Sequence, residues 1–303
     1  SLDTSAINII KDVFKIPSEE IKDIAILKKG MTNRSFLFTC KGNRYIMRIP
    51  GEGTDKLINR EDEAAVYEAI RDKGLCDNPI YINPRNGYKI TEYLRDVRNC
   101  DAGSLADVEM CIDKLREFHN MNLKVKHRFD IFEQLEFYES LWQGRPSIYR
   151  DYSVTKERVL SLKPFIEKNV DRICLTHIDA VPDNFLIRNS NDVSSDGSSI
   201  QLIDWEYSGM QDPHVDIAMF AIYSMYDKEK IDWLIDLYFE GNVSDNIRAK
   251  IYAYVSLCGL LWSNWSEYKS SLGIEFGKYS LLQYRYAKKY YRYASEIISR
   301  EEA

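Results

Sequence analysis

A short polar cluster interrupts an apolar stretch near the middle of the chain, and its residue types are those that carry out group transfer. The stretch is LTHIDAVPDNFLIR, in which Asp179 follows His177 by two residues and precedes Asn184 by five. A carboxylate so placed can accept a proton from a substrate hydroxyl, and an amide oxygen five residues further on can coordinate a metal ion. Pro182 stiffens the backbone between them. We therefore expect a catalytic loop here.

A second carboxylate, Asp204, closes the apolar run IQLIDWE twenty residues after Asn184. A carboxylate at the end of a strand that faces an Asp/Asn loop is suited to binding metal ions on the phosphates of a nucleotide. Each element alone is a weak signal, because a lone Asp after a strand commonly begins a turn or caps a helix. Their combined order, H-x-D-x-x-x-x-N and then Asp, is that of kinases and predicts phosphoryl transfer.

The segment KKGMTNRSFLF, upstream of these residues, has the form strand, turn, strand. A glycine and small polar residues in such a turn can present backbone N–H groups to phosphates. The same pattern is also that of an ordinary hairpin turn, and both interpretations stay open. The candidate nucleotide-binding residues of this turn are Gly30, Thr32, Asn33, Arg34 and Ser35.

Arg48, in the run RYIMRIP, occupies the strand position at which protein kinases place a phosphate-contacting Lys. Glu63, in the helix expected next, could pair with Arg48 and hold it in position. The alternative is an exposed strand arginine and a solvated helix glutamate, which would contribute little. In ITEYL, the backbone groups of Glu92 and Leu94 could form hydrogen bonds with an adenine edge.

Hydrophobic periodicity predicts an α+β protein in which strands precede long helices. Apolar spacing and turn residues indicate a helix over 5–15, an antiparallel meander of the three β-like runs 24–29, 35–40 and 44–49, a helix over 56–71, and short strands over 79–82 and 88–94. Helices are then expected over 104–122, 131–142, 154–169, 215–239, 244–268 and 276–299. We expect a small β-rich N-terminal lobe over 1–94, which binds the nucleotide, and a larger, mostly helical lobe over 95–303, which carries catalysis and substrate binding.

Composition excludes several other classes of protein. The chain has 303 residues, of which 45% are hydrophobic and 29% charged, as in globular proteins. Its net charge of −6 argues against a nucleic-acid partner. The six cysteines form no C-x-x-C pair, which indicates neither zinc nor a disulfide framework and favours a reducing cytoplasm. We expect no secretion signal, because the first residues mix Asp and Lys with apolar residues, and no membrane insertion, because no apolar run approaches about eighteen residues. The oligomeric state is left open.

Two longer signatures bring in a resemblance to a known family. LTHIDAVPDNFLI, followed by LIDWEYSGMQDPHVDIAMF, resembles the paired signatures of the choline/ethanolamine kinases, in particular their bacterial, LicA-type branch. The most specific part is I-D-W-E-Y-S-G with D-P-x-x-D-I-A after it. The resemblance implies a bilobal, protein-kinase-like fold shared with aminoglycoside phosphotransferases, and ATP and Mg²⁺ as cofactors. Choline kinases are similar to this chain in using Arg where protein kinases have Lys, as at Arg48.

The resemblance also implies roles for single residues. Asp179 matches the catalytic base, while Asn184 and Asp204 match the magnesium ligands. Asp216 matches a position that steadies the catalytic loop by accepting backbone hydrogen bonds. Tyr223 is a departure, because some eukaryotic members have a Glu near the substrate at this position.

Aromatic residues late in the chain suggest how an acceptor could be bound. A quaternary ammonium has no N–H to donate, so its site depends on aromatic faces. Trp262 and Trp265 are three residues apart on one face of an expected helix. In the family a W-x-x-W pair contributes to the choline cage, and Tyr207 and Phe276 resemble further members. Aromatic residues at helical spacing also commonly pack a core.

The expected reaction is in-line transfer of the γ-phosphoryl group of ATP to the hydroxyl of choline, which yields phosphocholine. Tyr279 and Tyr284 are both candidates for the acceptor pocket, and the sequence does not choose between them. The acceptor could instead be ethanolamine, an aminoglycoside or another small amino alcohol, and polycationic acceptors would call for carboxylates in place of aromatic faces. A more remote alternative is a non-catalytic protein that binds a nucleotide or choline.

Overall fold

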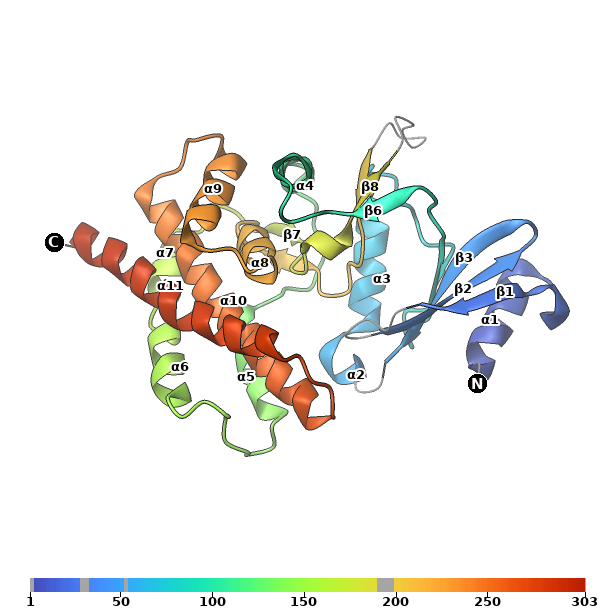
Figure 1. Cartoon of the computed structure of the whole chain (residues 1–303), viewed down its shortest axis with the longest axis horizontal. Helices are drawn as coiled ribbons and strands as arrows, with labels where there is room; N and C mark the ends of the chain where they lie inside the picture. Colours follow the sequence, from blue (N-terminus) through green and yellow to red (C-terminus); the bar gives the residue numbers. More distant parts are fainter. Residues whose placement is uncertain (1–2, 28–32, 52–53, 190–198, 303) are drawn as a thin grey trace. The chain divides into compact units, whose positions relative to one another are not determined.

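A computed structural model describes residues 3–27, 33–51, 54–189 and 199–302 (Figure 1). The chain forms two compact units. Unit 1 comprises Ser1–Asn99 and Leu186–Ser208, and unit 2 comprises Cys100–Phe185 and Gly209–Ala303. Unit 1 contains an antiparallel sheet and unit 2 is mostly helical, so the expected α+β fold class is confirmed.

The main sheet of unit 1 is antiparallel, with the strand order β1-β2-β3-β5-β4. Its first three strands form the meander that the three β-like runs predicted. Its strands are β1 (Lys22–Ile26), β2 (Asn33–Cys40), β3 (Asn43–Pro50), β4 (Tyr81–Ile82) and β5 (Lys89–Glu92). A three-stranded sheet of order β6-β8-β9 follows, built from β6 (Val97–Asn99), β8 (Phe185–Arg188) and β9 (Ile200–Leu202).

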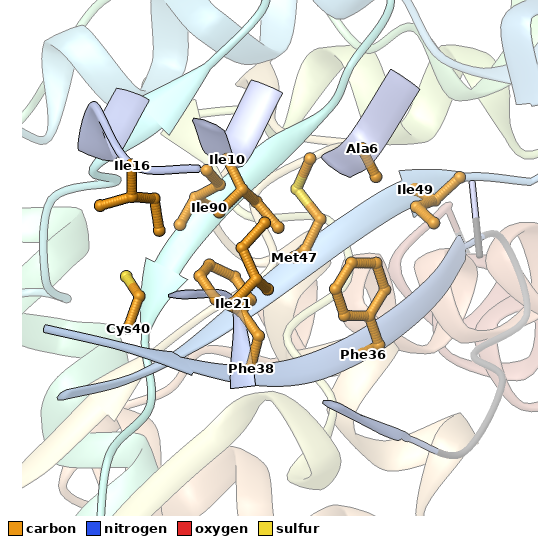
Figure 2. Packing of buried hydrophobic residues seen from close by; sticks show 10 residues of the cluster. All are labelled: Ala6, Ile10, Ile16, Ile21, Phe36, Phe38, Cys40, Met47, Ile49 and Ile90. Atoms are coloured by element: carbon orange, nitrogen blue, oxygen red, sulfur yellow. The ribbon is translucent and has the colours of Figure 1, made fainter. Parts of the chain in front are cut away.

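Helix α1 (Thr4–Phe14) packs against one face of the main sheet (Figure 1). Phe36 pairs with Met47 across β2 and β3, and Met47 pairs with Ile90 on β5. Side chains alternate between the two faces of a sheet, so these three residues point to the same side. Figure 2 shows the resulting cluster, which consists of Ala6, Ile10, Ile16, Ile21, Phe36, Phe38, Cys40, Met47, Ile49 and Ile90. The intervening positions on β3 and β5, Arg48 and Lys89, therefore point to the opposite face.

The helix expected over 56–71 is in fact two helices, α2 (Thr54–Leu57) and α3 (Arg60–Ala69). Asn59 separates them, because its backbone is extended and its side chain caps α3. The Asn59 carboxamide oxygen accepts hydrogen bonds from the backbone N–H groups of Glu61 at 2.9 Å and Asp62 at 3.0 Å. An N-cap of this kind begins a new helix even where the apolar period continues.

Unit 2 is built around a long buried helix, α10 (Asp245–Ser271), beside which α11 (Lys278–Glu302) runs (Figure 1). Gly259 permits this close approach, because a Cβ there would lie 2.6 Å from the carbonyl oxygen of Gln283. The other helices are α4 (Leu105–Asn120), α5 (Ile131–Ser140), α6 (Tyr152–Leu160), α7 (Lys163–Lys168), α8 (Val215–Tyr223) and α9 (Lys228–Phe239). Strands β7 (Cys174–Thr176) and β10 (Gly209–Gln211) pair antiparallel.

Two further helices expected from the sequence are each divided in the structure. The expected helix 154–169 divides into α6 and α7, because Pro164 lies in the first turn of α7 and donates no backbone hydrogen bond. The expected helix 215–239 ends at α8, after which Met225 has a φ of 59°. Asp227 then caps α9 by accepting a 2.9 Å hydrogen bond from the backbone N–H of Lys230. Within the described ranges, no helix is both long and apolar enough to cross a membrane.

Candidate active site

The predicted catalytic loop lies in unit 2, between β7 and a 3₁₀ turn over Pro182–Asn184. The Asn184 side-chain nitrogen donates to the backbone oxygen of Asp179 at 2.8 Å and to its carboxylate at 3.2 Å. The amide oxygen of Asn184 takes part in neither bond. Asp179 is half-buried, so its carboxylate keeps access to solvent while Asn184 fixes its position.

Asp216, in the first turn of α8, ties down the backbone that leads to Asp179. Its carboxylate accepts hydrogen bonds from the backbone N–H groups of His177 at 3.1 Å and Ile178 at 2.8 Å. Ile178 has a φ of 74°, a left-handed conformation that is costly for a β-branched residue. The two bonds to Asp216 hold this strained turn, and they are the contacts that the family resemblance implied.

His119, on α4, forms a hydrogen bond with Asp216, and the sequence analysis did not predict this contact. Its Nε2 lies 2.8 Å from Oδ2 of Asp216, and its Nδ1 lies 2.8 Å from the hydroxyl of Tyr238. The Asp216 carboxylate accepts a hydrogen bond from Nε2 of His119, and Nδ1 of the same ring shares a hydrogen bond with the Tyr238 hydroxyl. His119 and Asp216 are fully buried, so this network fixes the loop from within the core of unit 2.

In unit 1, Arg48 on β3 and Glu63 on α3 form the pair that the sequence predicted. Nη1 and Nη2 of Arg48 lie 2.5 and 2.7 Å from the two oxygens of Glu63. Arg48 also donates from Nε and Nη2 to the carbonyl oxygen of Gly87, at 3.1 and 2.5 Å. Burial would raise the pKa of Glu63, but the adjacent guanidinium outweighs it and lowers the pKa to about 2. The pair is thus charged and bidentate.

Two residues that the sequence analysis did not select extend this pair. Nη1 of Arg60, on α3, lies 3.1 Å from Glu63 and 3.2 Å from the carboxylate of Glu206. The side chain of Asn33 donates to Glu206 at 2.9 Å and accepts from Arg60 at 3.2 Å. The only sequence signal for Glu206 was its place in the D-W-E signature, next to a predicted metal ligand.

The other described residues that were predicted to bind the nucleotide do not belong to this network of charged side chains. Gly30 and Thr32 lie outside the described residues. On β2, Arg34 is exposed and Ser35 is half-buried. Glu92 is the last residue of β5, and Leu94 follows two residues later. The backbone N–H of the intervening Tyr93 donates to the carbonyl oxygen of Arg44 at 3.0 Å, which anchors this segment to β3.

Asp204 follows β9 directly and has a φ of 61°. Trp205, the next residue, is fully buried and donates from Nε1 to the carbonyl oxygen of Leu202 at 2.8 Å. Asp204 itself is exposed at the surface, although the protein atoms packed around its carboxylate remove part of its hydration. Desolvation by the surrounding protein raises the pKa of Asp204, the ammonium of Lys89 lowers it, and the carboxylate of Glu206 raises it further. Tyr207, a predicted acceptor-cage residue, is buried in unit 1.

The other predicted cage residues belong to unit 2 and form a line of ring contacts. Trp262 and Trp265 meet edge to face at 5.6 Å between centroids, and Trp265 lies 5.2 Å from Phe276. Two further rings continue the line, because Tyr279 lies 6.3 Å from Phe276 and 6.2 Å from Tyr223. Both tryptophans are buried, whereas the other three rings are half-buried.

This aromatic line leads to the catalytic loop. Burial raises the pKa of Tyr279, and the negative charge of Asp179 raises it further. The Tyr223 hydroxyl donates to the carboxylate of Asp183, on the same loop. Tyr284 lies elsewhere, since it stacks on Tyr149 at 3.8 Å and donates its hydroxyl hydrogen bond to Asp151. Of the two tyrosines that the sequence left open, Tyr279 is therefore the one beside the catalytic loop.

The donor atoms fit an oxygen-preferring divalent cation. Among the described residues, no three His, Cys, Asp or Glu side chains gather into a metal-binding cluster. Asn184 directs its nitrogen to Asp179 and retains an amide oxygen, and Asp204 presents an exposed carboxylate. Such hard oxygen donors suit Mg²⁺, which binds few protein ligands together with phosphate oxygens.

A protein-kinase-like fold, a loop with the order H-x-D-x-x-x-x-N and a buried Arg–Glu pair define a phosphotransferase. The chain belongs to the choline/ethanolamine kinase family, because the model of that family matches residues 24–255. It is an enzyme that transfers a phosphoryl group to an alcohol, as this family does, and the donor is an ATP-type nucleotide.

Similar proteins agree with this assignment. Protein LicA of Haemophilus influenzae is 28% identical over 265 residues, which cover 83% of this chain and 75% of LicA. The crystal structure of choline kinase LicA from Streptococcus pneumoniae matches with a TM-score of 0.78 and 31% identity, over 94% of this chain and 98% of that chain. A crystal structure of LicA in complex with AMP matches with a TM-score of 0.79 and 29% identity, over 97% and 100%.

Proposed function

We propose that this enzyme transfers the γ-phosphoryl group of ATP to the hydroxyl of choline, in a Mg²⁺-dependent reaction that yields phosphocholine. The observation that carries the choice of acceptor is the line of aromatic rings that runs from Trp262 to Tyr279, beside the loop that holds Asp179. A trimethylammonium group donates no hydrogen bonds, so ring faces and a nearby negative charge are its best partners. The similarity to the choline kinase LicA from Streptococcus pneumoniae supports the proposal.

The chemical step then depends mainly on positioning. The choline hydroxyl oxygen attacks the γ-phosphorus, the bond from that phosphorus to the bridging oxygen of ADP breaks, and Asp179 accepts the hydroxyl proton. Asn184 orients Asp179 through its two hydrogen bonds, at 2.8 and 3.2 Å. Asp216 holds the preceding backbone, as described above. The loop thereby holds Asp179 in position to accept the proton with little rearrangement.

Nucleotide binding is assigned to residues of unit 1. Arg48, held by Glu63, contacts the phosphates, and Gly30 and Thr32, which precede β2, are the candidates for backbone N–H groups that bind them. The backbone of Glu92 and Leu94 binds the adenine edge. Asn184 and Asp204 would hold Mg²⁺, which neutralises charge on the phosphates when it is bound. The complex of a similar LicA with AMP supports a nucleotide site in this fold.

Ethanolamine is the second candidate acceptor, because the family acts on both alcohols. Its primary ammonium carries three N–H donors and would need oxygen acceptors around it. Asp183 is the other carboxylate of the loop that carries Asp179, and it already accepts a hydrogen bond from the Tyr223 hydroxyl. The aromatic line therefore favours choline. The setting we propose is a reducing cytoplasm, which agrees with six free cysteines.

A panel of acceptors tests the proposal. The release of ADP from ATP and Mg²⁺ is followed with choline, ethanolamine or an aminoglycoside, together with a reaction that lacks an acceptor. We expect kcat/KM for choline to exceed that for ethanolamine by about tenfold or more, as a few cation–π contacts would provide. A preference for ethanolamine or an aminoglycoside would reject choline as the acceptor. Nucleotide binding without turnover of any acceptor would indicate a non-catalytic protein.

A further inference from the structure

Gly87, in the turn between β4 and β5, contacts both Arg48 and Arg60. It is buried and has a φ of 81°, a left-handed conformation that glycine adopts without strain. The backbone N–H of Gly87 donates to the carbonyl oxygen of Asn83 at 2.9 Å, and the backbone N–H of Asn83 donates to that of Tyr88 at 2.9 Å. The hydrogen bonds of the turn itself therefore hold Gly87 in place.

The carbonyl oxygen of Gly87 fixes one edge of the Arg48 guanidinium. It accepts hydrogen bonds from Nε at 3.1 Å and from Nη2 at 2.5 Å. Glu63 fixes the other edge, because its carboxylate lies 2.5 Å from Nη1 and 2.7 Å from Nη2. Within the described residues, these contacts use four of the five N–H groups of Arg48. The fifth is on Nη1, which lies 3.9 Å from Glu206, too far for a hydrogen bond.

The Cα of Gly87 faces the side chain of Arg60. A Cβ at this position would lie 2.4 Å from Nε, 2.5 Å from Cδ and 2.9 Å from Cγ of Arg60. Non-bonded carbon atoms pack at about 3.5–4.0 Å, so a side chain here would displace either Arg60 or the turn. Arg60 is buried and three other side chains of unit 1 hold its guanidinium. The turn would therefore shift, and its carbonyl oxygen would move away from Arg48.

We propose that Gly87 is a positioning residue of the nucleotide site. Its carbonyl oxygen orients Arg48, and its lack of a side chain leaves the space in which Arg60 binds Glu63. Glu63 is the other anchor of Arg48, so both contacts of Gly87 act on the same guanidinium. The consequence for catalysis rests on the proposed function, in which Arg48 contacts the phosphates of ATP.

Gly87→Ala and Gly42→Ala form a matched pair of variants. Gly42 lies in the turn between β2 and β3 of the same sheet and has a φ of 79°. Among the described residues, a Cβ at Gly42 would meet no atom within 4 Å beyond its chain neighbours. Alanine imposes the same backbone strain at both positions, but it collides with Arg60 only at position 87. Both variants should have a lower Tm, and only Gly87→Ala should lose affinity for the nucleotide.

Steady-state kinetics, and calorimetry with ATP and Mg²⁺, measure this difference. We expect the KM and Kd for ATP to rise about tenfold or more in Gly87→Ala, as the loss of a charge-assisted hydrogen bond would cause, and to stay within about twofold in Gly42→Ala. The KM for choline at saturating ATP should stay within about twofold in both. An equal rise in the KM for ATP in the two variants would overturn the positioning role. So would a KM for choline that rises as much as that for ATP in Gly87→Ala.

A second comparison tests the collision with Arg60. Arg60→Ala removes the three atoms that a Cβ at position 87 would meet. Adding Gly87→Ala to Arg60→Ala should therefore cause no further loss of ATP affinity. A further loss as large as that in the parental protein would exclude the collision and overturn the proposal. If Gly87→Ala alone is not recovered folded, this comparison still decides, because the double variant has the space that the single variant lacks.

The inference and the proposed function fail separately, because ATP binding is measured without an acceptor. Weaker ATP binding by Gly87→Ala, in a protein that does not phosphorylate choline, would support the role of Gly87 and reject the acceptor. Unchanged ATP binding by Gly87→Ala, in a protein that does phosphorylate choline, would reject the role of Gly87 and leave the acceptor assignment intact.

Discussion

The backbone N–H of Ile178 donates a 2.8 Å hydrogen bond to Oδ1 of Asp216, a residue 38 positions further along the chain. Ile178 has a φ of 74° at this point, one residue before Asp179. A β-branched residue in this region costs roughly 1–3 kcal/mol. The bond offsets part of that cost, so the direction of the Asp179 side chain depends on a carboxylate that is distant in sequence.

Asp216→Asn should therefore impair turnover. A carboxamide has one acceptor oxygen in place of two, so at least one of the three hydrogen bonds to Asp216 is lost, at a cost of about 1–3 kcal/mol. We expect a clear fall in kcat with little change in the KM for choline, measured by steady-state kinetics. Asp236→Asn, at an exposed acid in the same unit, serves as the control. A kcat within about twofold of the parental value would contradict the positioning role.

Asp179→Asn tests the assigned base. An amide cannot accept the hydroxyl proton, and loss of a general base typically costs about 10²–10⁴ in rate. We expect kcat to fall by this amount, while the affinity for ATP, measured by calorimetry, stays within about threefold. Asp183→Asn, on the same loop, should retain most of the turnover. Full activity in Asp179→Asn would rule out its role as the base.

Tyr279→Leu tests the aromatic line. Tyr279 is half-buried, so leucine removes the ring face without opening a deep cavity. A cation–π contact contributes about 0.5–2 kcal/mol, which corresponds to roughly a 2- to 30-fold increase in the KM for choline. The KM for ATP should not change. Tyr291→Leu, at another half-buried position of α11, is the matched control. Equal effects of the two substitutions on the KM for choline would remove Tyr279 from the acceptor site.

Glu63→Gln tests the charged pair through the pH dependence of stability. The pKa of Glu63 is lowered from 4.5 to about 2 in the folded protein. A lowered carboxyl pKa stabilises the fold above pH 4.5, by roughly 3 kcal/mol, and this contribution is lost as the pH falls towards 2. The parental protein should thus be more stable than Glu63→Gln at pH 7.

Urea unfolding between pH 7 and pH 3 measures this difference. The advantage of the parental protein over Glu63→Gln should stay constant down to about pH 5 and then shrink. Glu68→Gln, which removes an exposed carboxylate from the same helix, should show no such trend. An advantage that does not change over this range would show that Glu63 gains nothing from Arg48.

Local signals in the sequence predicted most elements of the fold. Apolar period and turn residues located the helices of unit 2 and the meander β1-β2-β3 because these depend on neighbouring residues. The divisions within three helices were missed, although Asn59 and Asp227 are good N-cap residues. The apolar period continued across both positions, and it masked the caps.

The candidate site, like the fold, could be predicted from the sequence only in part. The residues of the H-x-D-x-x-x-x-N loop and Asp204 could be selected because their spacing is fixed by one loop and one strand. The partners of these residues could not be selected. His119 contacts Asp216 across 97 positions and Arg60 contacts Glu206 across 146, and no spacing rule connects residues so far apart.

The alternation along β3 has a consequence for how a functional enzyme is assembled. Met47 is buried on the side of α1, and Arg48 is aimed at Glu63 on the side of α3. A slip of one residue against β2 or β5 would exchange the two side chains, so a cation would enter the apolar cluster and a thioether would face a carboxylate. A chain folded in the wrong register is therefore destabilised at both positions, Met47 and Arg48. The correct register of the sheet and the placement of Arg48 against Glu63 are thus set by the same pairing of strands.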